Sequence, residues 1–121
     1  MDPTVPTILA IQAESWNGIP VVMVAGEIDL STAPRLAEAM KQASVPGAPL
    51  VVNLAGVDFI DSAGTHALAV ADRAATEQGG RLMIVTSEFV ARVLEVSSLD
   101  RAFRLYGELR EALSAAAEPD R

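Results

Sequence analysis

The segment Leu50-Val-Val-Asn-Leu-Ala-Gly-Val-Asp-Phe-Ile-Asp-Ser-Ala-Gly64 determines how the rest of the chain is interpreted. Its first five residues are the apolar run expected of a strand that is buried on both faces of a parallel sheet. An acidic loop follows, and Ser62 then stands at the expected start of a helix. Because a helix N-terminus has unpaired N–H groups and a partial positive charge, a Ser there can be phosphorylated without harm to its helix. The segment therefore predicts a switch.

Two strands and a helix are expected before this segment. Residues 8–16 and 19–28 are rich in β-branched and apolar residues, and Asn17-Gly18 between them suits a type I′ hairpin turn. A helix with one apolar face follows and ends at the Pro-Gly-Ala-Pro run of residues 46–49. The chain is therefore expected to open with a β-hairpin.

The part after Ser62 continues the alternation of helices and strands. Apolar residues recur at helical spacing up to Gly79-Gly80, residues 82–86 predict a buried strand, and Ser87 is placed to cap a third helix. A short edge strand over 103–106 and a final helix complete the order ββαβαβαβα. Helices that join successive strands require crossovers, so the sequence predicts an α/β fold with a mostly parallel sheet, an N-terminal β-hairpin and helices packed on the sheet.

Composition restricts the class of protein. The chain has 121 residues, half of them hydrophobic, which predicts a single domain over 1–121 with an ordered core of about 8–116. Without Cys there is no disulfide, thiolate nucleophile or Cys-ligated metal. A net charge of −7 with scattered basic residues argues against direct nucleic-acid binding. The absence of a signal-like start and of a spanning apolar run predicts a cytoplasmic protein with no membrane contact.

Several polar side chains accompany Ser62. Asp29, Asp58 and Asp61 are all expected near strand ends, where they form either a negative rim for a basic partner or ordinary caps and turns. Their spacing does not match a known metal-ligand loop. His66 lies one helical turn beyond Ser62, where it either contacts the hydroxyl or simply faces solvent.

Two rival interpretations use the same residues. Ser62, His66 and an Asp offer a nucleophile, a base and an orienting acid, but Ile60-Asp-Ser-Ala-Gly64 lacks the Gly-x-Ser-x-Gly pattern of a hydrolase elbow. A receiver domain with a phosphorylated Asp is the second rival. The chain lacks the acidic pair after the first strand and the late Lys that receivers carry, so neither rival is favoured.

Four stretches together resemble a known family: Gly26-Glu-Ile-Asp29, residues 54–64, Gly79-Gly-Arg-Leu-Met-Ile-Val85 and residues 90–99. From about Ile8 to Ala116 the chain resembles the STAS domain in its bacterial anti-sigma factor antagonist form. The resemblance implies that the unphosphorylated protein binds an anti-sigma factor with Ser kinase activity, that the partner binds ATP, and that a sigma factor is thereby released. It also implies that Ser62 is the phosphoacceptor and that a phosphoserine phosphatase resets the system.

The resemblance places the partner-binding surface around the phosphoacceptor and implies neither an enzyme nor a cofactor of the chain's own. The implied surface consists of Asp29, Asp58, Asp61, Ala63, Gly64, Thr65 and His66. Some residues depart from the family pattern: Ala63 replaces a frequent second Ser, Thr65-His66 replaces Leu-Gly, and Ser98 replaces a Gly late in the third helix. The alternative within the family is a STAS scaffold or lipid-transport subunit without regulatory phosphorylation.

Overall fold

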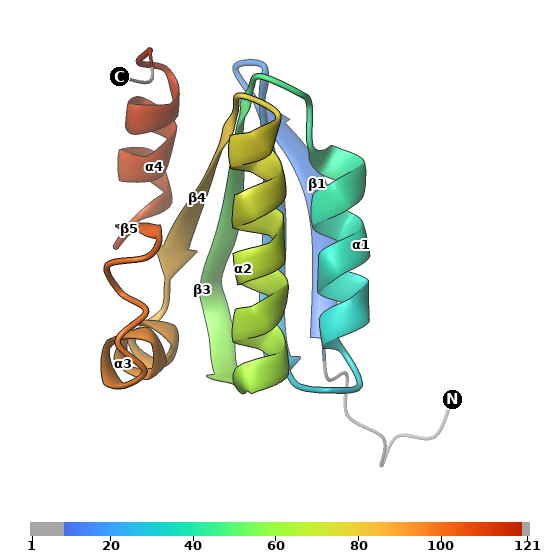
Figure 1. Cartoon of the computed structure of the whole chain (residues 1–121), viewed down its shortest axis with the longest axis vertical. Helices are drawn as coiled ribbons and strands as arrows, with labels where there is room; N and C mark the ends of the chain where they lie inside the picture. Colours follow the sequence, from blue (N-terminus) through green and yellow to red (C-terminus); the bar gives the residue numbers. More distant parts are fainter. Residues whose placement is uncertain (1–8, 120–121) are drawn as a thin grey trace.

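The structure is a computed structural model that describes residues 9–119. Over this range, strands and helices alternate in the predicted order, and the five strands form one sheet in the order β1-β2-β3-β4-β5 (Figure 1). Strand β1 is antiparallel to β2, and every other neighbouring pair is parallel. The elements are β1 (Leu9–Trp16), β2 (Ile19–Ile28), α1 (Ala33–Ala43), β3 (Pro49–Ile60), α2 (Ser62–Glu77), β4 (Arg81–Thr86), α3 (Glu88–Val96), β5 (Arg104–Tyr106) and α4 (Leu109–Ala116).

The predicted α/β class, parallel sheet and opening hairpin are confirmed. Asn17 and Gly18 have φ angles of 52° and 82°, as a type I′ turn requires, and Trp16 pairs with Ile19 across it. The predicted ordered core begins at residue 8, which lies outside the described residues. No helix within residues 9–119 combines the length and the apolar character needed to cross a membrane.

The central strands are buried on both faces because their side chains alternate between two cores. Adjacent residues Val51 and Val52 of β3, for example, point into different cores. Helices α1, α2 and α3 cover the face with the larger core, and α1 and α2 lie side by side on it, whereas α4 covers part of the other face (Figure 1). The buried residues of the smaller core are Val21, Val51, Met83, Val85, Ala112 and Ala116.

Strand β3 is longer than the sequence predicted. The expected acidic loop after Leu54 is instead a continuation of β3 that stays paired with β2 as far as Ile60. The pairing of β2 with β3 has two register shifts. At the second shift, the pairs Gly26↔Val57 and Glu27↔Phe59 leave Asp58 as an extra residue on β3, which forms a β-bulge. Asp58 is therefore on a bulged strand, and the prediction that it lies in a loop was wrong.

Candidate functional site

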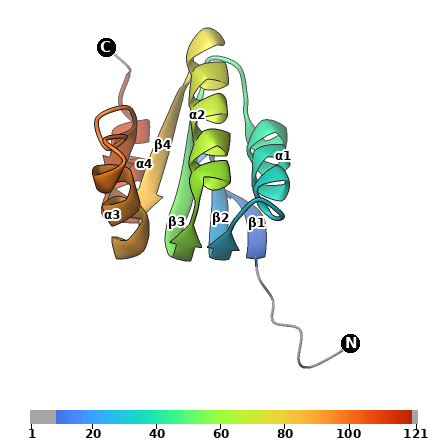
Figure 2. The ribbon, with the colours of Figure 1, turned by 60° about the horizontal axis from the view of Figure 1, so that its bottom comes forward.

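The site surrounds the junction between β3 and α2, at the carboxyl ends of the parallel strands. Asp29 follows β2 directly, Asp58 is near the end of β3, and Asp61 and Ser62 form the turn into α2. The Asp61 N–H donates to the Ile28 carbonyl at 3.1 Å, which ties the start of α2 to the end of β2. Figure 2 turns this end of the molecule forward. The fold thus brings residues from two distant parts of the sequence to one end of the sheet.

Asp61 is the N-cap of α2. One of its carboxylate oxygens, Oδ1, accepts hydrogen bonds from the Ala63 N–H at 2.9 Å and from the Gly64 N–H at 3.2 Å. Its extended backbone, with φ −112° and ψ −170°, is the conformation expected of an N-cap residue. Two of the N–H groups that a helix N-terminus offers to an anion are therefore already bonded inside the protein.

Ser62 is the first residue of α2 and is exposed. Its hydroxyl forms no hydrogen bond within the part of the chain that the structure describes. Thr65, the other hydroxyl on this turn, is buried, and its Oγ1 donates to the Ser62 carbonyl at 3.1 Å. Of the two hydroxyls, only that of Ser62 is open to a reacting partner.

Gly64 has a packing role. A Cβ on this residue would lie 2.5 Å from Cγ1 of Ile60 and 2.7 Å from Cγ2 of Ile28, closer than carbon atoms can approach. The absence of a side chain lets the first turn of α2 rest on the ends of β2 and β3. Ala63, partly buried, packs against the same core. Gly64 and Thr65 therefore position the site, while Ser62 and His66 face solvent.

Asp29 holds the turn between β2 and α1. Its Oδ1 accepts hydrogen bonds from the Ser31 hydroxyl at 2.7 Å, the Ser31 N–H at 2.9 Å and the Thr32 N–H at 3.0 Å. These bonds, the Ser31 hydroxyl first among them, hold the pKa of Asp29 below its ordinary value, against a smaller opposing effect of burial. Asp29 and Asp61 thus each stabilise a turn, whereas the Asp58 side chain is exposed.

His66 is exposed one turn beyond Ser62, on the same side of α2. The sequence has no Lys or Arg between Lys41 and Arg73, so His66 is the one basic side chain in that stretch. It forms no hydrogen bond within residues 9–119.

The sequence analysis missed an exposed aromatic pair beside this site. The rings of Phe59 in β3 and Phe89 in α3 have centroids 5.8 Å apart, and both residues are 39% exposed. Leu30, directly after Asp29, is 79% exposed. No clear signal was present in the sequence, because Phe89 lies four residues before Val93 and so adjoins the helical face that carries Val90, Val93 and Leu94.

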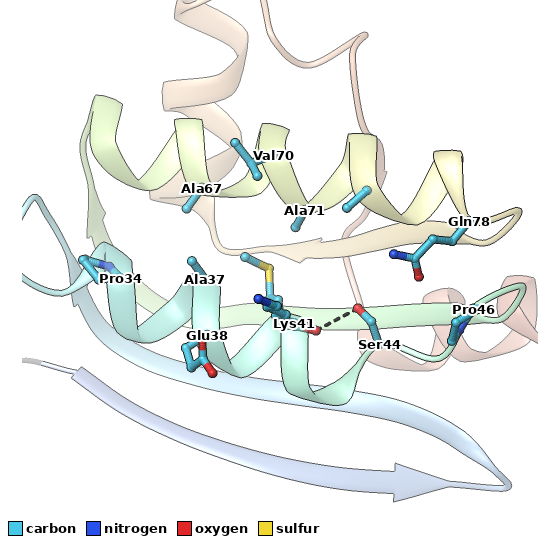
Figure 3. Close-up of a pocket in the computed structure, with 12 residues that line it drawn as sticks. Pro34, Ala37, Glu38, Lys41, Ser44, Pro46, Ala67, Val70, Ala71 and Gln78 are labelled. Carbon is cyan, nitrogen blue, oxygen red and sulfur yellow. Dashed lines mark hydrogen bonds between the residues drawn. The ribbon is translucent and has the colours of Figure 1, made fainter.

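A separate groove runs between α1 and α2. Its volume is about 610 Å³, and Figure 3 shows Ala37, Ala67 and Ala71 pointing into it. Lys41 and Glu38 are polar residues of its lining, and the Ser44 hydroxyl there donates to the Met40 carbonyl at 2.8 Å. Residues 9–119 contain no group of three or more His, Asp or Glu side chains that could hold a metal ion.

Comparison with known proteins identifies the family. The family model of the STAS domain matches residues 10–112. The chain belongs to the STAS domain family. It is 32% identical over 111 residues to the anti-sigma-F factor antagonist RsfB of Mycobacterium tuberculosis, with 90% of each chain covered. The resemblance inferred from the sequence motifs is therefore confirmed.

Solved structures agree with the assignment of a STAS domain. The crystal structure of an anti-sigma factor antagonist from Mycobacterium paratuberculosis is 32% identical, with a TM-score of 0.83, and the match covers 94% of this chain and 98% of that one. The antagonist SpoIIAA in its unphosphorylated form is 20% identical over 92% of this chain and all of its own, with a TM-score of 0.67, and shares the fold. These named STAS relatives are regulatory proteins.

Proposed function

We propose that this STAS domain is an anti-sigma factor antagonist that binds an anti-sigma factor with Ser kinase activity and is released when Ser62 is phosphorylated. The observation that carries the proposal is the state of the Ser62 hydroxyl, which is exposed and not hydrogen-bonded within the described range. Asp61 supplies the cap that a Ser at a helix start often supplies itself. A kinase can therefore modify Ser62 without removing any bond that holds α2.

The position of the phosphate explains the release. Phosphorylation adds a charge of about −1.5 to −2. Two of the α2 amides are already bonded to Asp61, so the phosphate stays outside the helix start, next to the Asp61 carboxylate. Burying this dianion without a counter-charge against a partner costs several kcal/mol, or a factor of about 10²–10³ in affinity. The modification thus blocks docking and leaves the fold intact.

The other predicted site residues divide by exposure. Asp58 and His66 are exposed and are proposed to contact the partner, while Gly64 and Thr65 act by holding the helix start in place. The partner binds ATP and catalyses the transfer, so the antagonist itself is proposed to be neither an enzyme nor a cofactor-binding protein. A phosphoserine phosphatase returns it to the binding form. This cycle places the protein in the cytoplasm with its partners.

Intact-mass analysis tests the proposal. The chain is incubated with ATP and, in turn, each purified anti-sigma factor kinase of its source organism. We expect one of them to add a single phosphate, which peptide mapping locates on Ser62 and which Ser62→Ala abolishes. Ser114→Ala is a matched control that retains the phosphate, because Ser114 is an exposed Ser on α4, which packs on the opposite face of the sheet. Absence of phosphate with every kinase, or its persistence in Ser62→Ala, contradicts the proposal.

The groove between α1 and α2 favours one alternative, a STAS subunit that binds an apolar molecule such as a lipid chain. Its lining is mainly apolar and includes Val70, which is 54% exposed. This alternative predicts that an alkyl ligand shifts the NMR signals of Ala67 and Ala71, and that Ala71→Leu prevents this by filling the groove. It also predicts that no kinase modifies Ser62.

A further inference from the structure

We infer that Phe59 and Phe89 anchor the antagonist on its partner, and that Leu30 extends the same contact surface. Phe59, Phe89 and Leu30 are together called the aromatic patch. The inference rests on the proposed function and adds the surface through which that function is exerted. The partner it fits is an anti-sigma factor kinase with an apolar cleft bordered by basic side chains.

The fold exposes Phe59 through the bulge in β3. Side chains alternate along a regular strand, so Val57 and Phe59 would both point into the core. The extra residue Asp58 shifts this alternation: Val57 and Ile60 are buried, and Phe59 is turned outward. Bulges are frequent where a fold redirects a side chain beside a functional site. The third Phe of the chain, Phe103, is 9% exposed, which contrasts with the 39% of the other two.

Hydrogen bonds of Ser87 tie together the two backbone segments that carry Phe59 and Phe89. The Ser87 hydroxyl donates to the Val57 carbonyl at 2.6 Å and accepts from the Val90 N–H at 3.1 Å. These bonds fix the first turn of α3, which carries Phe89, against the part of β3 that carries Phe59. Side chains that are already positioned lose little freedom on binding, and aromatic residues of this kind dominate the binding energy of many interfaces.

The aromatic patch and Ser62 can lie under one partner. Phe59 precedes Ser62 by three residues, so their Cα atoms are at most about 11 Å apart. Leu30 is two residues beyond Ile28, whose carbonyl accepts the Asp61 N–H. A typical interface covers about 800 Å² on each protein, which is enough to include all these residues. A phosphate on Ser62 would then be forced against the edge of an apolar contact.

The charges around the aromatic patch indicate the chemistry of the partner. Asp29, Asp58, Asp61 and Glu88 lie within one or two residues of Leu30, Phe59 or Phe89 in the sequence. Complementary potentials favour specific association, so basic side chains that pair with these carboxylates, and so leave no counter-charge for a phosphate on Ser62, are expected around the partner's apolar cleft. On a different protein whose apolar patch has no carboxylates around it, the partner's basic side chains would lose water without gaining a counter-charge. The acidic border of the aromatic patch therefore contributes to specificity.

The test measures binding to the kinase that phosphorylates Ser62 in the mass assay, by isothermal titration calorimetry. We expect Phe89→Ala and Phe59→Ala each to weaken binding by about thirtyfold or more, as for other aromatic anchors. Val96→Ala is the matched control, because Val96 is also apolar, on α3 and 80% exposed. It is expected to bind like the wild type.

A photo-crosslinking experiment complements the alanine variants because it keeps an aromatic ring at the tested position. Its result therefore does not depend on whether the fold tolerates the loss of a Phe side chain. Benzoylphenylalanine at position 89 is expected to crosslink to the kinase, and the same group at position 96 is not. The inference alone is overturned if Ser62→Glu weakens binding while both Phe variants bind like the wild type and position 89 gives no crosslink. If the wild type binds no anti-sigma factor kinase, the proposed function fails and the inference fails with it.

Discussion

The starts of α2 and α3 place a Ser in similar positions but in different chemical states. Each helix follows a parallel strand of the sheet, β3 or β4. At α3, Ser87 is the cap, and its hydroxyl bonds both the Val90 N–H and the Val57 carbonyl. At α2, Asp61 is the cap, and the Ser62 hydroxyl remains outside the helix. The residue that caps the helix therefore decides whether the neighbouring hydroxyl is structural or available for modification.

The hydroxyls of Thr65 and Thr32 resemble that of Ser87 more than that of Ser62. The Thr65 hydroxyl donates to the Ser62 carbonyl, and the Thr32 hydroxyl donates to the Glu27 carbonyl at 3.0 Å. Such hydroxyls cannot gain a phosphate without losing a bond that the native state uses. Ser62 differs from Thr65, Thr32 and Ser87 because no hydrogen bond of its hydroxyl holds the described fold.

The largest difference in stability is expected between Ser87→Ala and Ser62→Ala. Ser87→Ala removes a helix cap and leaves the Val57 carbonyl without this partner, so the free energy of unfolding should fall by about 2 kcal/mol. Ser62→Ala should change it by no more than about 0.5 kcal/mol. Urea denaturation monitored by circular dichroism measures both. Equal losses would show that the Ser62 hydroxyl also supports the fold.

Asp61→Ala is expected to have the next largest effect. Loss of the α2 cap should lower the free energy of unfolding by about 1 kcal/mol, while Asp61→Asn, which can still cap, should stay close to the wild type. The same denaturation experiment applies. If Asp61→Ala is as stable as the wild type, the amides of α2 do not need this carboxylate, and the explanation for the available Ser62 hydroxyl is wrong.

The far end of α3 carries a third informative Ser. Ser98 has φ +59°, and the bonds from the Leu99 N–H to the Leu94 carbonyl and from the Ser98 N–H to the Glu95 carbonyl form a Schellman C-cap. Gly suits this conformation better, so Ser98→Gly should raise the free energy of unfolding by about 0.5–1 kcal/mol. Ser97→Gly is the control, since Ser97 has φ −83° and gains nothing from Gly. A gain from Ser97→Gly instead would contradict this account of the C-cap.

Local signals were enough to predict the fold and the position of Ser62. The Asn17-Gly18 turn, the apolar run at Leu50 and the periodicity after Ser62 each reflect interactions between residues close in the sequence. The bulge at Asp58 was not predictable in this way, because it depends on the pairing of β3 with β2. Phe59 was missed for the same reason, since the bulge is what turns it outward.

The smallest expected effect concerns Asp29. Its pKa is lowered first by the hydrogen bond from the Ser31 hydroxyl, so Ser31→Ala should raise it toward the ordinary value of 3.8. A carboxyl group whose pKa is lowered in the folded state stabilises the protein at pH values above its ordinary pKa. This stabilisation is lost as the pH falls through the lower pKa of the folded state. Ser31→Ala should therefore lose less stability on acidification than the wild type. NMR titration of the Asp29 carboxyl carbon checks this, with Ser62→Ala as the unaffected control.

Binding by a protein that carries phosphoserine at position 62, installed during translation, tests the central claim most directly. Its affinity for the anti-sigma factor kinase is compared with that of the unmodified protein by calorimetry, and NMR spectra of both report on the core. We expect affinity to fall by about 10²–10³-fold while core signals such as those of Val52 and Leu68 stay unchanged. Equal affinity of the two forms, or shifts throughout the core, would contradict the account.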